Sequence, residues 1–168
     1  MKVLVACEFS GRVRDAFTKL GHDAMSCDFL PSETPGKHYT GDIRDLINDY
    51  WDLMICHPPC TFLAVSQAWC FYHPEDKKLP PPQRRPHPKF PNRRQQKQES
   101  LEFCKSLMNS NIPLICMENP VGFLNTQYRK PDQIIQPWQF GHEESKKNLP
   151  VVKGFTVINS YKDYGNKE

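Results

Sequence analysis

The sequence predicts an α/β fold with a mostly parallel sheet and helices on both faces. Two observations carry this prediction. Short apolar segments alternate with amphipathic segments of helical period through most of the 168 residues, which is the pattern of such folds. Two of the apolar segments also end at polar residues, and in an open parallel sheet such strand ends lie side by side where ligands bind. By its length the chain is expected to form a single domain, residues 1–168.

Each expected element follows from its local pattern. The first strand covers residues 3–9, and the turn Ser10-Gly11 leads into a helix at 12–20 that Gly21 ends. The later elements, in order, are a strand at 23–27 ending at Asp28, a short strand or turn closed by Thr40-Gly41-Asp42, a helix at 43–50, a strand at 53–56, a long helix at about 93–109, a strand at 113–117 and a last strand at 155–160.

Composition limits the class of protein. The chain has no apolar run long enough to cross a membrane, and it enters a strand pattern at once with no signal peptide ahead of it. Its seven cysteines are an odd number and lie mostly inside apolar segments, which favours reduced thiols in the cytoplasm. Cys56, His57 and Cys60 have no second pair to complete a metal site, so no metal is expected.

A basic, proline-rich loop is expected at about 71–97. Within it, residues 77–97 carry eight basic side chains, no acidic one, and six prolines, which oppose regular structure. Long loops inside compact domains are usually functional or disordered, and both interpretations stay open. The functional interpretation is a phosphate-binding flap, whose candidate residues are Arg84, Arg85, Lys89, Arg93 and Arg94.

The most informative residues follow the apolar segments 53–56 and 113–117. Cys60 stands after a diproline beyond the first segment, and Glu118-Asn119 follows the second. A thiolate can add to C6 of a pyrimidine, and a carboxylic acid near N3 can stabilise the charge that develops. C5 then becomes able to attack an electrophilic methyl group. The alternative interpretation is a buried thiol and a surface carboxylate without chemistry.

The N-terminal segment has the general form of a ligand-binding turn. A strand, a glycine turn and a helix at residues 7–13 are the usual means of placing a small charged ligand over a helix N-terminus. Asp28, 17 residues after Gly11, stands where an acidic residue commonly holds ribose hydroxyls. The turn has one glycine where the dinucleotide fingerprint has three, so NAD is not expected.

Five short motifs within residues 1–125 together resemble the cytosine-C5 methyltransferase family in their order and approximate spacing. In chain order they are Phe9-Ser10-Gly11, Asp28, Asp42, Pro58-Pro59-Cys60 and Glu118-Asn119. The resemblance implies a Rossmann-like, S-adenosylmethionine-dependent methyltransferase fold, with C5 methylation of cytosine in DNA through covalent addition of Cys60 to C6. The residues it implies are Phe9, Ser10, Gly11, Asp28, Asp42 and Pro58 for binding S-adenosylmethionine, and Cys60, Glu118 and Asn119 for catalysis.

The chain also departs from that family. Val13 and His57 stand where glycines are usual, and Thr61 where glutamine is usual. An arginine-rich motif after the glutamate motif is not recognisable, and the target-recognition domain is absent. The resemblance is therefore to short, bacteriophage-type members, which implies the cytoplasm of a bacterial host. Two alternatives stay open: C5 modification of a free pyrimidine nucleotide such as dCMP, and a non-catalytic binder of nucleotides or nucleic acid on the same fold.

Overall fold

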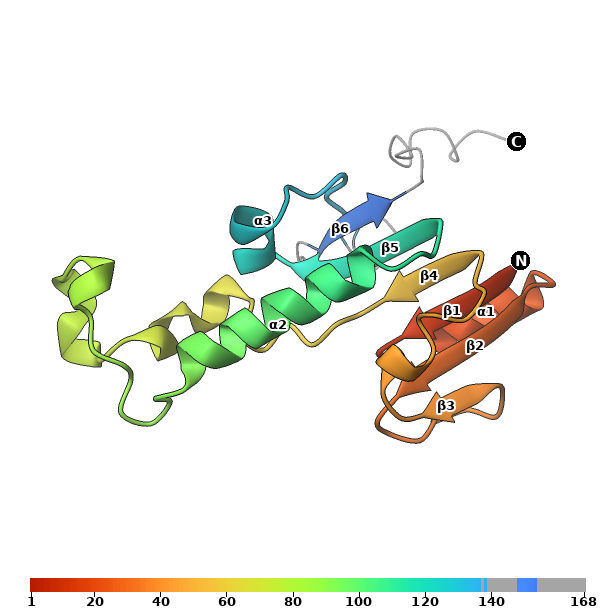
Figure 1. Ribbon diagram of the computed structural model, residues 1–168, viewed down its shortest axis with the longest axis horizontal. Coiled ribbons are helices and arrows are strands. Elements are labelled where there is room, and N and C mark those ends of the chain that lie inside the picture. The colour runs from red at the N-terminus through yellow and green to blue at the C-terminus, as the bar shows by residue number, and fades with distance from the viewer. Residues whose placement is uncertain (137, 139–147, 154–168) are drawn as a thin grey trace.

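The computed structural model describes residues 1–136, 138 and 148–153, and its described strands form one sheet (Figure 1). The strand order is β3-β2-β1-β4-β5-β6, in which β1 to β5 are parallel and β6 pairs antiparallel with β5. The predicted α/β class and mostly parallel sheet are confirmed, and the arrangement is compatible with a Rossmann-like fold. The strands are β1 (Lys2–Ala6), β2 (Asp23–Asp28), β3 (His38–Thr40), β4 (Leu53–Cys56), β5 (Leu114–Pro120) and β6 (Asn148–Lys153).

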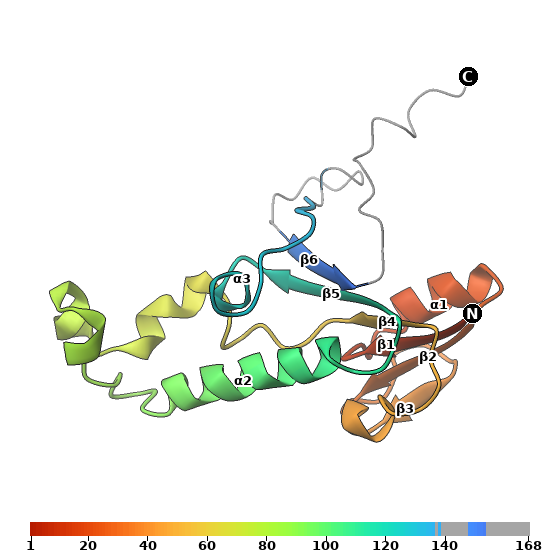
Figure 2. The ribbon, with the colours of Figure 1, turned by 45° about the horizontal axis from the view of Figure 1, so that its top comes forward.

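Helices cover both faces of the sheet (Figure 2). On one face, Val13 and Phe17 of α1 (Arg12–Lys19) pack against a buried cluster that includes Val3 and Val5. On the other face, α2 (Arg93–Met108) contributes buried side chains at helical spacing, Leu101 among them, to the larger core cluster. None of the helices in the described residues is both long and apolar enough to span a bilayer. A short helix, α3 (Phe123–Gln127), follows β5.

Several predicted boundaries change. The first strand ends at Ala6, because Cys7 has a φ of +58°, which lies outside the β region. The predicted helix at 43–50 is only a three-residue 3₁₀ helix, η1 (Ile43–Asp45). The indole N–H of Trp51 donates to the Leu46 carbonyl at 2.8 Å. In a helix that continued to residue 50, this carbonyl would instead accept a backbone N–H of the helix. The predicted strand at 155–160 lies outside the described residues, whereas β6 was not predicted.

The loop predicted at 71–97 contains more regular structure than its prolines suggested. The 3₁₀ helices η2 (Val65–Phe71), η3 (Pro74–Lys78) and η4 (Pro81–Gln83) precede α2, which begins at Arg93. Pro74 and Pro81 stand at the first positions of their helices, where a missing N–H costs nothing. Residues 65–97, here called the arm, extend away from the sheet together with the first turns of α2 (Figure 1).

Candidate functional site

The strand order reverses between β1 and β4, and this reversal positions the candidate site. The chain winds outward from β1 in both directions, to β2 and β3 on one side and to β4 and β5 on the other. Ligands bind outside the carboxyl ends of the strands at such a switch point. Parallel register aligns Ala6 with Cys56, and Cys56 with Met117. The residues after Cys56 and after Met117 therefore lie at the same edge of the sheet.

The structure brings the two predicted catalytic motifs together at this edge. His57 Nδ1 and Glu118 Oε2, on neighbouring strands, lie 3.8 Å apart with both side chains partly exposed. Asn119 is 1% exposed, and its Nδ2 donates a hydrogen bond to the Pro58 carbonyl at 3.3 Å. Asn119 thereby joins the β5 strand directly to the diproline that precedes Cys60. Because β6 pairs with this part of the chain, β5 runs to Pro120, so Glu118 and Asn119 lie inside the strand rather than after it.

A second set of contacts fixes the segment after Cys60. The Cys60 carbonyl accepts hydrogen bonds from the amides of Leu63 and Ala64 at 2.9 and 3.0 Å, which makes Cys60 the head of a tight turn. Phe123 N–H then donates to the Leu63 carbonyl at 2.8 Å. A Cβ on Gly122 would stand 2.0 Å from that same carbonyl oxygen, so only glycine allows this approach. The Cys60 thiol is half-buried at the head of the turn.

Two polar atoms of this group are buried and make no hydrogen bond within the described part of the chain. They are Asn119 Oδ1 and His57 Nε2. Buried polar atoms in native proteins nearly always have a partner. These two atoms are therefore candidates for contact with a bound ligand.

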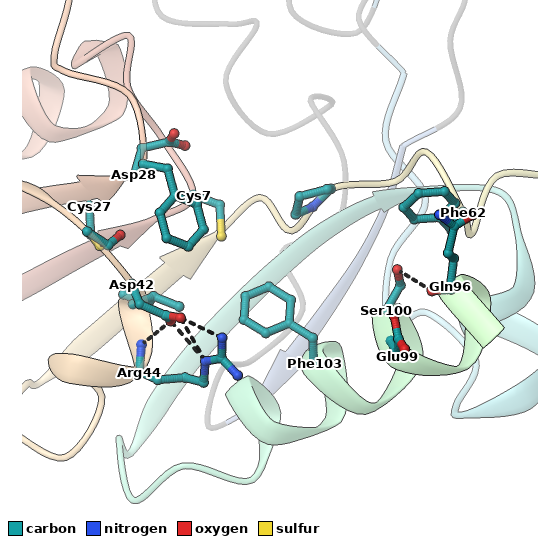
Figure 3. A pocket seen from close by; sticks show the side chains of 14 residues that line it. Cys7, Cys27, Asp28, Asp42, Arg44, Phe62, Gln96, Glu99, Ser100 and Phe103 are labelled. Carbon is teal, nitrogen blue, oxygen red and sulfur yellow. Dashed lines mark hydrogen bonds and ion pairs between the residues drawn. The ribbon is translucent and has the colours of Figure 1, made fainter. Parts of the chain in front are cut away.

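A cavity of about 440 Å³ lies beside this group, between the carboxyl ends of β1 and β2 and one side of α2 (Figure 3). It is lined by Asp28 and Asp42, two residues for which the resemblance predicts binding of S-adenosylmethionine. Pro59 lines it in place of the predicted Pro58, and Phe62 and Phe103 were not predicted. Phe9, Ser10 and Gly11 are not among its lining residues, nor are Cys60 and Glu118.

Two of the three acidic residues that line the cavity, Asp28 and Asp42, are held by backbone hydrogen bonds. Asp28 Oδ1 accepts the Leu30 N–H at 3.0 Å, and Asp42 Oδ1 accepts the Arg44 N–H at 2.9 Å. The Arg44 guanidinium also forms an ion pair with Asp42, and these hydrogen bonds hold the pKa of that carboxyl below its usual range. Asp42 is consequently an ionised hydrogen-bond acceptor at neutral pH.

The cysteines beside the cavity are unsuited to nucleophilic chemistry. Burial, followed by the nearby Asp28 carboxylate, raises the pKa of the Cys7 thiol to about 12. Burial likewise raises the pKa of Cys27 to about 12. A thiol with such a pKa is protonated at neutral pH and behaves as a small apolar group. Cys7 and Cys27 are therefore walls of the cavity rather than candidate nucleophiles.

The glycine turn differs in detail from the expected ligand-binding turn. Glu8 is buried, and its Oε1 accepts hydrogen bonds from the Ser10 hydroxyl at 2.6 Å and from the Val13 N–H at 3.2 Å. A carboxylate of the chain itself thus occupies part of the α1 N-terminus, where a charged ligand was expected. Glu8 was missed by sequence reasoning, although an acidic side chain within a glycine turn was the signal that could have found it.

Gly11 is required by its surroundings. Its φ is +75°, and a Cβ there would lie 2.1 Å from Thr34 Oγ1. Beneath it Arg14 is 1% exposed and donates to Ser32 Oγ at 3.0 Å and to the Thr34 carbonyl at 3.2 Å. Arg14 thereby anchors the loop that follows Asp28.

Arg93, a predicted phosphate contact, faces inward. It is 7% exposed, donates to the Thr61 carbonyl at 2.9 Å, and places its guanidinium 4.6 Å from the Phe62 ring centre. Its position corrects the expectation of a solvent-facing flap residue, since it holds the segment directly after Cys60. Aromatic rings stabilise the buried guanidinium, because Phe62, Phe71 and Phe90 surround it with their ring centres 4.6 to 5.9 Å away.

The other predicted phosphate contacts lie on the arm. Arg85 forms an ion pair with the buried Asp76 at 2.7 Å. Arg84 Nε donates to the Leu79 carbonyl at 2.6 Å, and Arg94 donates to the Arg84 carbonyl at 2.7 Å. These arginines hold the arm together through neutral carbonyls and the carboxylates of Asp76 and Glu75, and Lys89 is exposed at its surface. Their binding of phosphate stays a prediction.

No model of a known protein family and no curated protein sequence matches the chain. Its function is therefore to be inferred from the geometry of the site and the chemistry of its residues.

Proposed function

We propose that this chain methylates C5 of cytosine in DNA, using S-adenosylmethionine, with Cys60 as the nucleophile and Glu118 as the partner of N3. One observation carries the proposal. The turn headed by Cys60 and the strand that bears Glu118 are bonded to one another through Asn119 and Pro58, with a ligand-sized cavity beside them. A nucleophile and a carboxyl group held at one strand edge are what covalent pyrimidine chemistry needs.

The residues of the cavity fit S-adenosylmethionine. A cavity of about 440 Å³ is within the usual range for small-ligand sites, and its walls combine aromatic rings with three carboxylates, those of Asp28, Asp42 and Glu99. Asp28 would accept hydrogen bonds from the ribose hydroxyls, and Asp42 would accept one from the adenine amino group. Phe29 and Phe103 offer apolar surface to the purine. When bound, the cofactor supplies an electrophilic methyl group.

The chain's own residues supply the remaining steps. The Cys60 thiolate forms a bond from Sγ to C6 of cytosine, and electron density moves to N3, where the Glu118 carboxyl donates a hydrogen bond. C5 takes the methyl group, and the sulfonium sulfur that carried it is left as a thioether. Solvent water then accepts the proton from C5, and the electron pair of that C–H bond re-forms the C5–C6 double bond as the Sγ–C6 bond breaks and returns the thiolate. In a duplex, C6 is shielded by stacking, so the base must leave the helix to reach Cys60.

Covalent trapping tests the nucleophile. DNA that contains 5-fluorocytosine should form a stable adduct with the wild-type chain in the presence of S-adenosylmethionine, because fluorine cannot leave C5 as a proton does. Cys60→Ser should form none. Cys116→Ser is the matched control, since burial raises the pKa of that thiol, and it should be trapped as wild type. An adduct in Cys60→Ser would remove the assignment.

Two further substitutions separate catalysis from cofactor binding. Glu118→Gln should lower the trapping rate by roughly 10²–10⁴, the range of a lost general acid, while DNA still binds. Asp28→Ala should weaken S-adenosylmethionine binding about tenfold or more in calorimetry, because charge-assisted hydrogen bonds to the ribose are lost. Asp49→Ala, at an exposed position outside the cavity, is the control and should bind normally. Normal binding by Asp28→Ala would make Asp28 a turn residue only.

A free pyrimidine nucleotide is the second candidate substrate. The observation that favours it is the use of Arg84, Arg85 and Arg94 within the arm, because a single phosphate needs fewer cations than a duplex backbone. Turnover of dCMP and of DNA should be compared at equal concentrations of cytosine. Faster turnover of dCMP would select the nucleotide. Cofactor binding without turnover of either would select a non-catalytic binder.

A further inference from the structure

Charge is strongly segregated between the arm and the rest of the chain. Residues 65–97 contain eight basic and two acidic side chains, a net charge of +6, whereas the whole chain carries only +3. The remaining residues therefore carry a net charge of −3. Figures 1 and 2 both show the arm extending away from the sheet at the end where β4 leads into it. A projecting element with this charge is suited to a polyanion.

Three rings on the arm lie in contact and are here called the aromatic cluster: Trp69, His87 and Phe90. The Trp69 ring lies 5.5 Å from His87 and 5.8 Å from Phe90, nearly perpendicular to both. His87 is buried beneath, 5.1 Å from Phe90. Trp69 is nevertheless 54% exposed. Its indole is thus fixed in direction by two neighbours while more than half of it reaches solvent, although large aromatic side chains are normally covered.

The aromatic cluster is connected rigidly to the Cys60 turn. Arg93 donates to the Thr61 carbonyl at 2.9 Å and to Gln67 Oε1 at 3.3 Å, two residues before Trp69. The same guanidinium lies 5.9 Å from the Phe90 ring. One buried cation therefore touches the turn after Cys60, the helix that bears Trp69 and a ring of the cluster. A nucleic acid whose base reached Cys60 would have its next nucleotides beside this cluster.

We propose that the aromatic cluster is a base-stacking platform for DNA, with Trp69 stacking on an unpaired base near the target cytosine. The exposed lysines of the arm, Lys77, Lys78 and Lys89, contact the phosphates of the same strand. This inference rests on the proposed function in its DNA form. Aromatic rings bind bases of any sequence through their faces, and cations beside them follow the backbone.

The arm's charge argues against a second copy of the chain as the occupant. Two arms packed through Trp69 would bring together two net charges of +6. A DNA strand is complementary to both the charge and the rings. DNA is therefore the expected occupant of the cluster, and self-association of the chain would contradict the proposal.

The test is the affinity of Trp69 variants for a short labelled DNA duplex carrying one unpaired cytosine, measured by fluorescence anisotropy at fixed salt. Trp69→Ala should weaken binding about tenfold or more, the effect of losing one stacked base. Trp69→Phe should stay within about threefold, because a ring remains. Tyr50→Ala, which removes a ring that is 78% exposed outside the arm, should bind as wild type. Wild-type affinity in Trp69→Ala overturns the platform.

Three further measurements test the platform independently. DNA should quench a component of wild-type tryptophan fluorescence that Trp69→Phe lacks. This experiment does not require the alanine variant to fold. Lys89→Ala should reduce the salt dependence of binding by about one counterion, whereas Trp69→Ala should leave it unchanged. A change from dimer to monomer in Trp69→Ala would assign the cluster to self-association and overturn the proposal.

Trapping of a free nucleotide distinguishes failure of the base-stacking platform from failure of the proposed Cys60 chemistry. Trapping of 5-fluoro-dCMP through Cys60 needs no DNA contact, so Trp69→Ala should trap this nucleotide at the wild-type rate. Nucleotide trapping with unchanged DNA affinity would overturn the platform and leave the nucleophile assignment standing. Loss of nucleotide trapping in Trp69→Ala would place Trp69 in the active site and also overturn the platform.

Discussion

Gly122→Ala is expected to displace the Cys60 turn from β5 and so to separate the two halves of the proposed catalytic pair. The glycine lies just after β5, and the Leu63 carbonyl of the Cys60 turn packs directly against it. The new Cβ would stand 2.0 Å from Leu63 O and 2.8 Å from Leu63 C, whereas real Cβ contacts essentially never fall below 3.0 Å. Both close atoms belong to the backbone, so no side-chain rotation can relieve the clash.

The magnitude follows from these distances. Restoring a 3.0 Å contact moves the Cys60 turn about 1 Å away from β5. A displacement of about 1 Å at reacting groups costs on the order of 10²-fold in rate. The hydrogen bonds from Phe123 N–H to the Leu63 carbonyl and from Val65 N–H to the Val121 carbonyl are also strained or lost. At about 0.5–1.5 kcal/mol each, their loss lowers the free energy of unfolding by roughly 1–3 kcal/mol.

Two assays measure these effects. Urea denaturation should show a lower midpoint with an unchanged slope, and the trapping rate on 5-fluorocytosine DNA should fall about 10²-fold. S-adenosylmethionine binding should fall much less than the trapping rate, because Asp28 and Asp42 of the cavity stay in place, although Pro59 and Phe62 of the displaced segment also line it. Gly21→Ala is the matched control: its φ is +82° but no atom lies within 4 Å of the new Cβ. It should lose about 1–2 kcal/mol through strain and keep its trapping rate. A wild-type trapping rate in Gly122→Ala would refute this account of the site.

Three more outcomes are expected. Hydrogen bonds from Arg85 lower the pKa of the Asp76 carboxyl from 3.8 to about 2, so the folded arm binds that proton less readily than the unfolded chain. Its stabilisation is present above about pH 4 and is lost as the pH falls towards 2; tryptophan fluorescence should report this change, and Asp76→Asn should abolish it. Iodoacetamide at neutral pH should alkylate Cys60 before Cys7, whose pKa burial raises to about 12, as peptide mass spectrometry would show. Asn119→Ala leaves the Pro58 carbonyl without its side-chain donor and should cost about 1–3 kcal/mol in urea denaturation, with slower trapping.

Much of the fold could be predicted from local pattern. The strand at 53–56 and the start of the long helix at Arg93 agree with the structure, because both rest on hydrophobic periodicity and on nearby turn residues. The helix at 43–50 failed because Trp51, just beyond it, takes a carbonyl that the helix would need. Antiparallel pairing with β6 extends β5 past its apolar core, and no short-range signal reported that pairing.

The sequence by itself determined that Cys60 and Glu118 lie at one edge of the sheet, because the carboxyl ends of parallel strands meet there. Only the tertiary structure decided how they are joined. The bond from Asn119 to the Pro58 carbonyl links residues 61 positions apart. Tertiary contacts also decided that Arg93 is a buried anchor while Lys89 is exposed. A basic segment of the sequence indicates only where positive charge lies. The partner of each cation depends on which carbonyls, carboxylates and rings the folded chain brings within reach.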